Sequence, residues 1–120
     1  MRRGYLLYLE DILESAKNIQ DYVGDRTFED LKKDRMRIDA IVRNFEIIGE
    51  ASSKMPQEVR DKYPFVEWMR IYDFRNVLIH EYFGINYKIM WDIIKNKLPK
   101  LNKDIQHILE KEKIIPDTIN

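Results

Sequence analysis

The sequence predicts an all-α fold, an antiparallel four-helix bundle with a short extra helix between the second and third long helices. Apolar residues recur every three or four positions along four stretches of the chain, which is the pattern of amphipathic helices. Only 4 Gly and 4 Pro occur in 120 residues, fewer than the many turns of a sandwich would need. Short connections join the four stretches, and such connections favour antiparallel neighbours in a bundle.

The first predicted helix covers residues 5–23, where the apolar positions form one stripe. Gly24 follows it directly, as glycine does just past many helix ends. The second predicted helix covers residues 27–54. Its start resembles a capping pair, in which oxygens of Thr27 and Asp30 accept hydrogen bonds from free amides of the first turn.

Two residues inside the second predicted helix stand out. Gly49 costs the helix about 1 kcal/mol against Ala, and a glycine so placed usually allows another backbone to approach closely. Glu50 follows it. Its carboxylate either lines a functional cleft or takes part in helix packing, and the pattern leaves both roles open.

The second half of the chain contains three more helical segments. Residues 56–63 form the short extra helix. The third long helix begins at Pro64, where a missing amide costs nothing, and ends near residues 83–84. The fourth runs over residues 85–109, and Pro99 either kinks it or splits it in two. From about residue 114 the periodicity stops, so we expect a loose tail.

Composition indicates one domain over residues 1–120. Hydrophobic residues make up 44% and charged residues 35%, which suits one core with a densely charged outside. The chain has no Cys, which excludes disulfides, thiolate metal sites and a cysteine nucleophile. It has 21 basic and 21 acidic residues, without the basic surplus of a dedicated duplex-binding protein. Any contact with nucleic acid should therefore be local or built by several subunits.

The apolar run near the amino terminus is short, because Glu10, Asp11 and Glu14 interrupt it before it reaches the length of a signal peptide. No stretch approaches the ~20 apolar residues that a membrane span needs. We therefore expect a cytoplasmic protein without membrane contact.

The densest cluster of reactive side chains lies within residues 75–82, Arg-Asn-Val-Leu-Ile-His-Glu-Tyr. On a straight helix Asn76 and His80 share a face, whereas Arg75 and His80 diverge by roughly 140°. Arg75 and His80 could meet if the helix unwinds near His80, or across a two-fold interface. The alternative is that Arg75 is solvated, His80 is an interior histidine and Tyr82 belongs to the core.

This run resembles the signature of the HEPN superfamily, an Arg followed four to six residues later by a His. Its form Arg-x-x-x-x-His-x-Tyr is similar to that of the HepT-like toxins of HEPN/minimal-nucleotidyltransferase toxin–antitoxin pairs. The resemblance covers residues from about 5 to 110. Flanking segments match in the same order: Ile47–Ala51, Tyr63–Pro64, Trp68, Asp73, Trp91–Ile94 and Leu98–Pro99.

The resemblance implies a HEPN-like helical domain that forms a homodimer with its two motifs facing each other. It further implies a metal-independent endoribonuclease, acting without a cofactor, whose catalytic residues are Arg75, Asn76 and His80. The cognate minimal nucleotidyltransferase would silence such a toxin by adding AMP to Tyr82.

The residue types suit cleavage of RNA. His80 can exchange protons near neutral pH, so it can take the proton of a 2′-hydroxyl or protonate the leaving oxygen. The planar guanidinium of Arg75 can hold phosphate oxygens and stabilise the charge that develops on them. Asn76 can orient either the imidazole or the phosphate.

Other residues offer weaker candidates for a site. The lysines at positions 95, 97, 100 and 103 form either a basic face toward RNA or a solvated helix face. Trp68 and Trp91 are expected in the core rather than as platforms for bases, and His107 as an ordinary surface or core residue.

Two other functions remain open at this point. One is a non-catalytic HEPN subunit that binds nucleotide or scaffolds its partner transferase. The other is a structural dimer without a ligand. An intact set of Arg75, Asn76 and His80 favours catalysis, because a scaffold has no need of all three.

Overall fold

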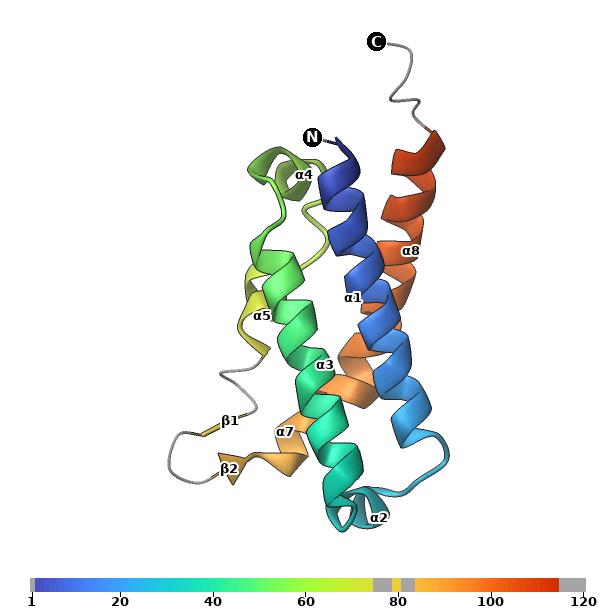
Figure 1. The fold of residues 1–120 in the computed structure, drawn as a ribbon, viewed down its shortest axis with the longest axis vertical. Helices are drawn as coiled ribbons and strands as arrows, with labels where there is room; N and C mark the ends of the chain where they lie inside the picture. Colours follow the sequence, from blue (N-terminus) through green and yellow to red (C-terminus); the bar gives the residue numbers. More distant parts are fainter. Residues whose placement is uncertain (1, 75–78, 81–83, 115–120) are drawn as a thin grey trace.

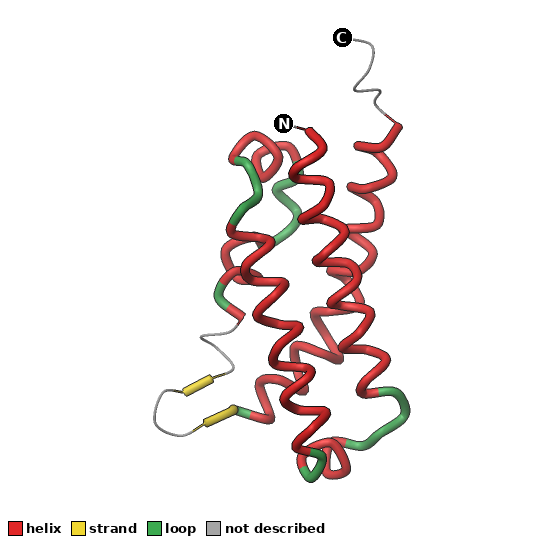
Figure 2. The backbone as a smooth tube through the Cα atoms, viewed as in Figure 1, coloured by secondary structure: helices red, strands yellow, loops and turns green. Residues whose placement is uncertain are grey.

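Helices make up most of the described backbone, so the predicted all-α class is confirmed (Figure 1). The structure, a computed structural model, describes residues 2–74, 79–80 and 84–114. Side chains are described for residues 4–74 and 84–113. Helices α1, α3 and α8 run along the long axis, and the described strands are confined to one short pair at one side (Figure 2). None of the described helices is long and apolar enough to cross a membrane.

Helix α1, Arg2–Val23, packs along α3, Arg35–Ser53, and buries the apolar stripe that the sequence predicts. Leu9 and Ile12 of α1 and Phe45 of α3 are fully buried where the two helices pack. Gly24 ends α1 with a φ of +52°, and its amide donates to the Gln20 carbonyl at 2.9 Å. The predicted glycine at the helix end is therefore confirmed, because this backbone conformation favours glycine.

The second predicted helix is wrong in one respect, because it is divided in two. Helix α2, Phe28–Lys32, ends before Asp34, and α3 begins after it. The Thr27 hydroxyl accepts from the Asp30 amide at 3.1 Å, as predicted. The Asp34 carboxylate accepts from the Arg37 amide at 3.1 Å and so starts a new helix.

The short extra helix is confirmed as α4, Gln57–Lys62, but the third long helix is wrong. Helix α5 covers only Trp68–Tyr72. The backbone is extended at β1, Ile79–His80, which pairs antiparallel with β2, Gly84–Ile85. A β-branched residue, Ile79, favours a strand, and Gly84 supplies a φ of +78° beside it.

The fourth predicted helix is confirmed from Tyr87 onward, although its predicted first residue, Ile85, lies in β2. It consists of three contiguous segments, which we together call the rod: α7, Tyr87–Asp92, the π-helical η1, Ile93–Lys97, and α8, Leu98–Ile114. Pro99 lies in the first turn of α8 and does not split the rod. A proline lacks an amide proton and its ring clashes with the carbonyl four residues earlier. The π-helical η1 ends two residues before Pro99.

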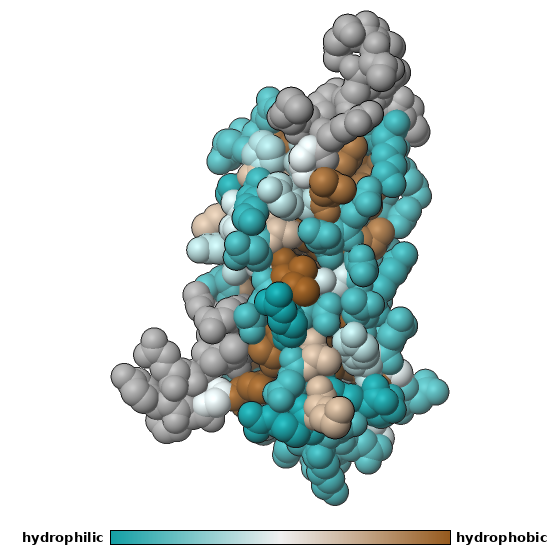
Figure 3. Space-filling view, in the orientation of Figure 1, coloured by the Kyte–Doolittle hydropathy of each residue, from teal (hydrophilic) through white to brown (hydrophobic). Residues whose placement is uncertain are grey.

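Helix α5 packs against α3. Gly49 permits this contact, because a Cβ there would lie 3.0 Å from the Tyr72 carbonyl oxygen. The predicted close backbone approach at Gly49 is confirmed. The face of the molecule in Figure 3 is largely hydrophilic, with small separated apolar patches, as expected for a densely charged exterior.

Candidate functional site

The structure describes only part of the predicted catalytic segment. Arg75, Asn76 and Tyr82 lie outside the described residues, as does the side chain of His80. The backbone of His80 belongs to β1, where its Cα lies opposite that of Gly84. The helical geometry in which Arg75 and His80 diverge therefore does not apply at His80. The convergence of the Arg75, Asn76, His80 and Tyr82 side chains on one site stays a prediction.

Packed residues hold both ends of this segment. On its amino-terminal side the buried Phe74 ring meets Phe45 edge-to-face, with 5.4 Å between centroids. On its carboxyl-terminal side Ile85 packs against the core, and Met90 of α7 is buried. The residues between Phe74 and Gly84 thus connect two fixed points of the fold.

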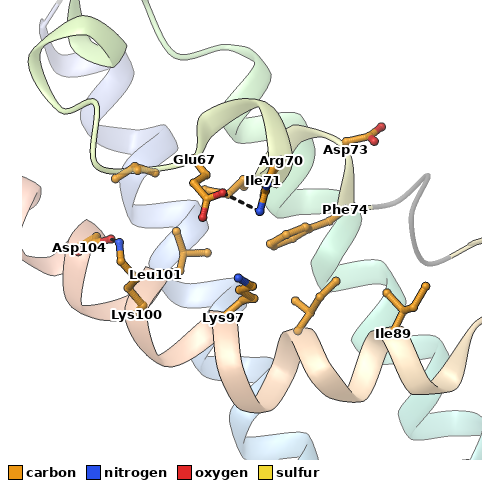
Figure 4. A pocket seen from close by; sticks show the side chains of 12 residues that line it. Glu67, Arg70, Ile71, Asp73, Phe74, Ile89, Lys97, Lys100, Leu101 and Asp104 are labelled. Carbon is orange, nitrogen blue, oxygen red and sulfur yellow. Dashed lines mark hydrogen bonds and ion pairs between the residues drawn. The ribbon is translucent and has the colours of Figure 1, made fainter.

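A groove lies beside Phe74, between α5 and the η1–α8 part of the rod (Figure 4). It has a volume of about 310 Å³. Ile71, Phe74 and Leu101 form part of its apolar lining, with Ile93 from η1. We call it the α5 groove.

The rim of the α5 groove carries charges of both signs. Arg70 pairs with Glu67 at 3.0 Å, and Lys100 pairs with Asp104 at 2.5 Å. The Lys97 side chain extends from the rod toward the α5 side (Figure 4). Because the pairs neutralise one another, the rim offers little net attraction for a phosphate.

Glu50 lines a different, shallow groove together with Tyr8 of α1. Its side chain is 71% exposed and pairs with Lys54 at 3.6 Å. The alternative role in helix packing is therefore wrong for Glu50. The neighbouring Gly49 makes the helix contact instead.

The four lysines do not form one face. Lys97 and Lys100 line the α5 groove, whereas the Lys95 ammonium lies 4.7 Å from the centre of the Trp91 ring. Lys103 is exposed.

The two tryptophans and His107 differ in burial and in the residues that they contact. Trp68 is buried and its Nε1 donates to the Tyr63 carbonyl at 3.1 Å, so its core role is confirmed. Trp91 is half-buried against Phe28, with 5.6 Å between ring centroids. His107 is exposed, and its ring lies 6.3 Å from that of Phe65.

Sequence reasoning missed Glu112, a buried carboxylate of α8 that is only 3% exposed. It accepts hydrogen bonds from the hydroxyls of Tyr5 and Tyr63 and from Lys62 Nζ, the last at 2.9 Å. Burial opposes its ionisation, but these hydrogen bonds and the charge of Lys62 outweigh burial and lower its pKa to about 2.

The place of Glu112 indicates a structural role. The carboxylate joins α1, α4 and α8 at the end of the bundle opposite β1 and β2 (Figure 1). Its position on the apolar stripe of α8, three and four residues after Leu109 and Ile108, was the sequence signal for burial.

One protein-family model matches the part of the chain that contains both the long helices and the Arg-x-x-x-x-His-x-Tyr segment. The model described as "Ribonuclease HepT-like" matches residues 12–108 of the chain. The match covers most of the 120 residues. This chain belongs to the ribonuclease HepT-like family.

Individual relatives agree with this assignment. A protein of Methanocaldococcus jannaschii named "Putative RNase" is 45% identical over 86% of this chain and 85% of its own length. Another of that name, from Caldanaerobacter subterraneus subsp. tengcongensis, is 45% identical over 88% of this chain and 95% of its own. The "Probable ribonuclease HepT" of Thermococcus cleftensis is 36% identical over 84% of this chain and 92% of its own. No solved structure matches the chain.

Proposed function

We propose that this chain is a metal-independent endoribonuclease, the toxin of a type VII-like toxin–antitoxin pair. The observation that carries the proposal is the intact motif of Arg75, Asn76, His80 and Tyr82 in a member of the ribonuclease HepT-like family. The fold supports it, because the segment lies between two packed anchors, Phe74 and Ile85.

The proposed reaction is attack of a ribose 2′-oxygen on the adjacent phosphorus. The 2′-O–P bond forms, the bond from phosphorus to the 5′-oxygen breaks, and the leaving oxygen gains a proton. His80 serves as the base for the 2′-hydroxyl or as the acid for the 5′-oxygen. Arg75 stabilises the charge that develops on the phosphate oxygens, and Asn76 orients the phosphate or the imidazole.

We further propose a homodimer in which the two motifs face each other, so that one His80 acts as acid and the other as base. Exposed apolar side chains on α5 support an interface close to the motif: Met69 is 66% exposed and Tyr72 is 51% exposed. Both precede Arg75 by no more than six residues.

The remaining partner is a cognate minimal nucleotidyltransferase that transfers AMP to Tyr82. The added phosphate would compete with RNA for the guanidinium of Arg75, and its negative charge would repel incoming RNA. Silencing of this kind requires no change of fold.

The test is incubation of the purified protein with total cellular RNA in EDTA, with and without the partner transferase, Mg²⁺ and ATP in a preceding step. We expect cleavage by the untreated protein and its loss after the partner treatment. RNA left intact by the untreated protein would contradict the catalytic proposal and favour the non-catalytic subunit.

A further inference from the structure

A third groove lies at β2 and has a volume of about 350 Å³. It is formed by α2 together with β2 and α7, which follow each other in the chain more than 50 residues after α2. Its lining includes Phe28 and Lys32 of α2, Gly84 and Ile85 of β2, and Tyr87 and Lys88 of α7. We call it the β2 groove.

The strand pairing places this groove next to His80. The Cα of Gly84, which lines the groove, is the direct partner of the His80 Cα in the β1–β2 pair. Directly opposed residues of antiparallel strands have Cα atoms about 4.5–5.5 Å apart. The β2 groove is therefore within reach of a nucleotide whose neighbouring phosphate lies at His80.

The charge of the β2 groove differs from that of the α5 groove. Its lining contains two lysines and no carboxylate. Among the described residues, no acidic side chain pairs with Lys88, which is exposed, and Lys32 has only Glu29, at 3.9 Å. In a chain with no net charge, this is a local excess of positive charge.

Aromatic rings stand among these cations. Phe28 and Tyr87 are half-buried, and the Phe28 ring is held against Trp91 with 5.6 Å between centroids. The Lys32 ammonium lies 5.2 Å from the centre of the Phe28 ring. Lysines for phosphates, interleaved with rings on which bases stack, are the elements that proteins use to bind single-stranded nucleic acid.

We propose that the β2 groove is a substrate subsite that holds one nucleotide of single-stranded RNA beside the scissile phosphate. Lys32 and Lys88 hold its phosphates, and its base stacks on Phe28 or Tyr87. The volume is near the lower end for a small-molecule site, which limits the occupant to about one nucleotide. The assignment rests on the proposed ribonuclease function and names where the substrate strand lies.

The experiment measures binding of the full chain to a fluorescent 2′-O-methyl oligoribonucleotide, which cannot be cleaved because its 2′-oxygens are blocked. The test variant carries Lys32→Ala and Lys88→Ala. The control is Lys111→Ala, an exposed lysine near the far end of α8. We expect the double variant to bind on the order of tenfold more weakly at 0.1 M salt. The slope of log affinity against log salt should fall by about 1.4, and the control should leave both unchanged.

A second variant, Phe28→Leu, separates stacking from charge. It keeps an apolar side chain against Trp91 but removes the ring face. We expect weaker binding with an unchanged salt slope, since no phosphate contact is lost. Melting temperatures near that of the parent show that each variant is folded.

The binding results test the proposed subsite separately from the proposed ribonuclease function. Parent-like affinity and salt slope in the lysine double variant would overturn the subsite and leave the ribonuclease proposal standing. No binding of the oligonucleotide by the parent would overturn both. If the double variant loses capture of the partner transferase but keeps RNA binding, the groove is a protein-docking surface and the subsite is again overturned.

Discussion

Glu112 is the described residue whose local environment has the clearest thermodynamic consequence. Its pKa is about 2 in the folded protein, below the ordinary value of 4.5. Because the folded state holds the proton less tightly than the unfolded state, ionised Glu112 stabilises the fold above pH 4.5. That stabilisation is lost as the pH falls from 4.5 toward 2. A shift of this size corresponds to about 3 kcal/mol.

We predict that Glu112→Gln lowers the free energy of unfolding at pH 7 by up to about 3 kcal/mol, with a smaller loss near pH 3. The amide cannot accept from Tyr5, Tyr63 and Lys62 as the carboxylate does. Urea unfolding at several pH values measures this. Glu110→Gln is the control, because Glu110 is exposed on the same helix. Equal losses at pH 7 and pH 3 would contradict the assignment.

We predict that Tyr82→Phe keeps RNA cleavage but escapes silencing, because the phenol oxygen is the proposed acceptor of AMP and takes no part in the proposed proton transfers. Protein, partner transferase and ATP are incubated, and modified residues are mapped by mass spectrometry. Silencing of the variant to the same extent as the parent would refute this mechanism.

At the scale of elements, α5 packs against α3 and precedes the proposed catalytic segment in the chain. Gly49 lets α5 approach α3 closely, and after Asp73 the chain continues into Phe74 and Arg75. We predict that Gly49→Ala destabilises the fold by about 1–2 kcal/mol, although Ala favours helix by about 1 kcal/mol. The added methyl group would meet the Tyr72 carbonyl at 3.0 Å, so α5 must shift.

Thermal unfolding and RNA cleavage of the Gly49→Ala variant check this prediction, and cleavage should also fall because α5 directly precedes the proposed catalytic residues in the chain. Gly4→Ala in α1 is the control, since a Cβ there meets nothing within 4 Å. A Gly49→Ala protein at least as stable as the parent would show that the contact is looser than described.

The elements differ in how well the sequence predicts them. Helices α1 and α4, the Thr27 cap and the 87–114 rod follow from local patterns, namely apolar spacing and capping residues. The failures also have local causes. Asp34 starts a new helix although the apolar stripe continues past it, and Ile79 pairs with Ile85 where spacing suggested a helix. Such competition between a strand pair and a helix is decided by tertiary contacts, which periodicity does not contain.

The candidate site was predicted from a family motif and not from helical periodicity. Arg75, Asn76, His80 and Tyr82 were selected by their resemblance to a family motif, and helical geometry alone left Arg75 and His80 apart. The β2 groove was not predicted, because Phe28 and Tyr87 are brought together only by packing of α2 against α7. The Glu112 cluster likewise joins residues more than 100 positions apart.

At the scale of the whole molecule, we predict a homodimer that buries the face carrying residues 75–82. The exposed Met69 and Tyr72 would lie in or beside this interface. Light scattering at micromolar concentration should give twice the mass of the 14.6 kDa chain. Met69→Glu should shift the protein toward monomer, whereas Met36→Glu, at an exposed methionine of α3, should not. A parent that is monomeric throughout would contradict the prediction.

We propose that residues 75–80 cleave RNA by acid–base catalysis, and end-group analysis on a defined single-stranded RNA in EDTA measures this reaction. We predict products that end in a 2′,3′-cyclic phosphate and a 5′-hydroxyl. Arg75→Ala and His80→Ala should each lower the rate by at least about 100-fold, with melting temperatures near that of the parent. Cleavage that persists in His80→Ala, or loss of cleavage only because that variant unfolds, would refute catalysis by His80.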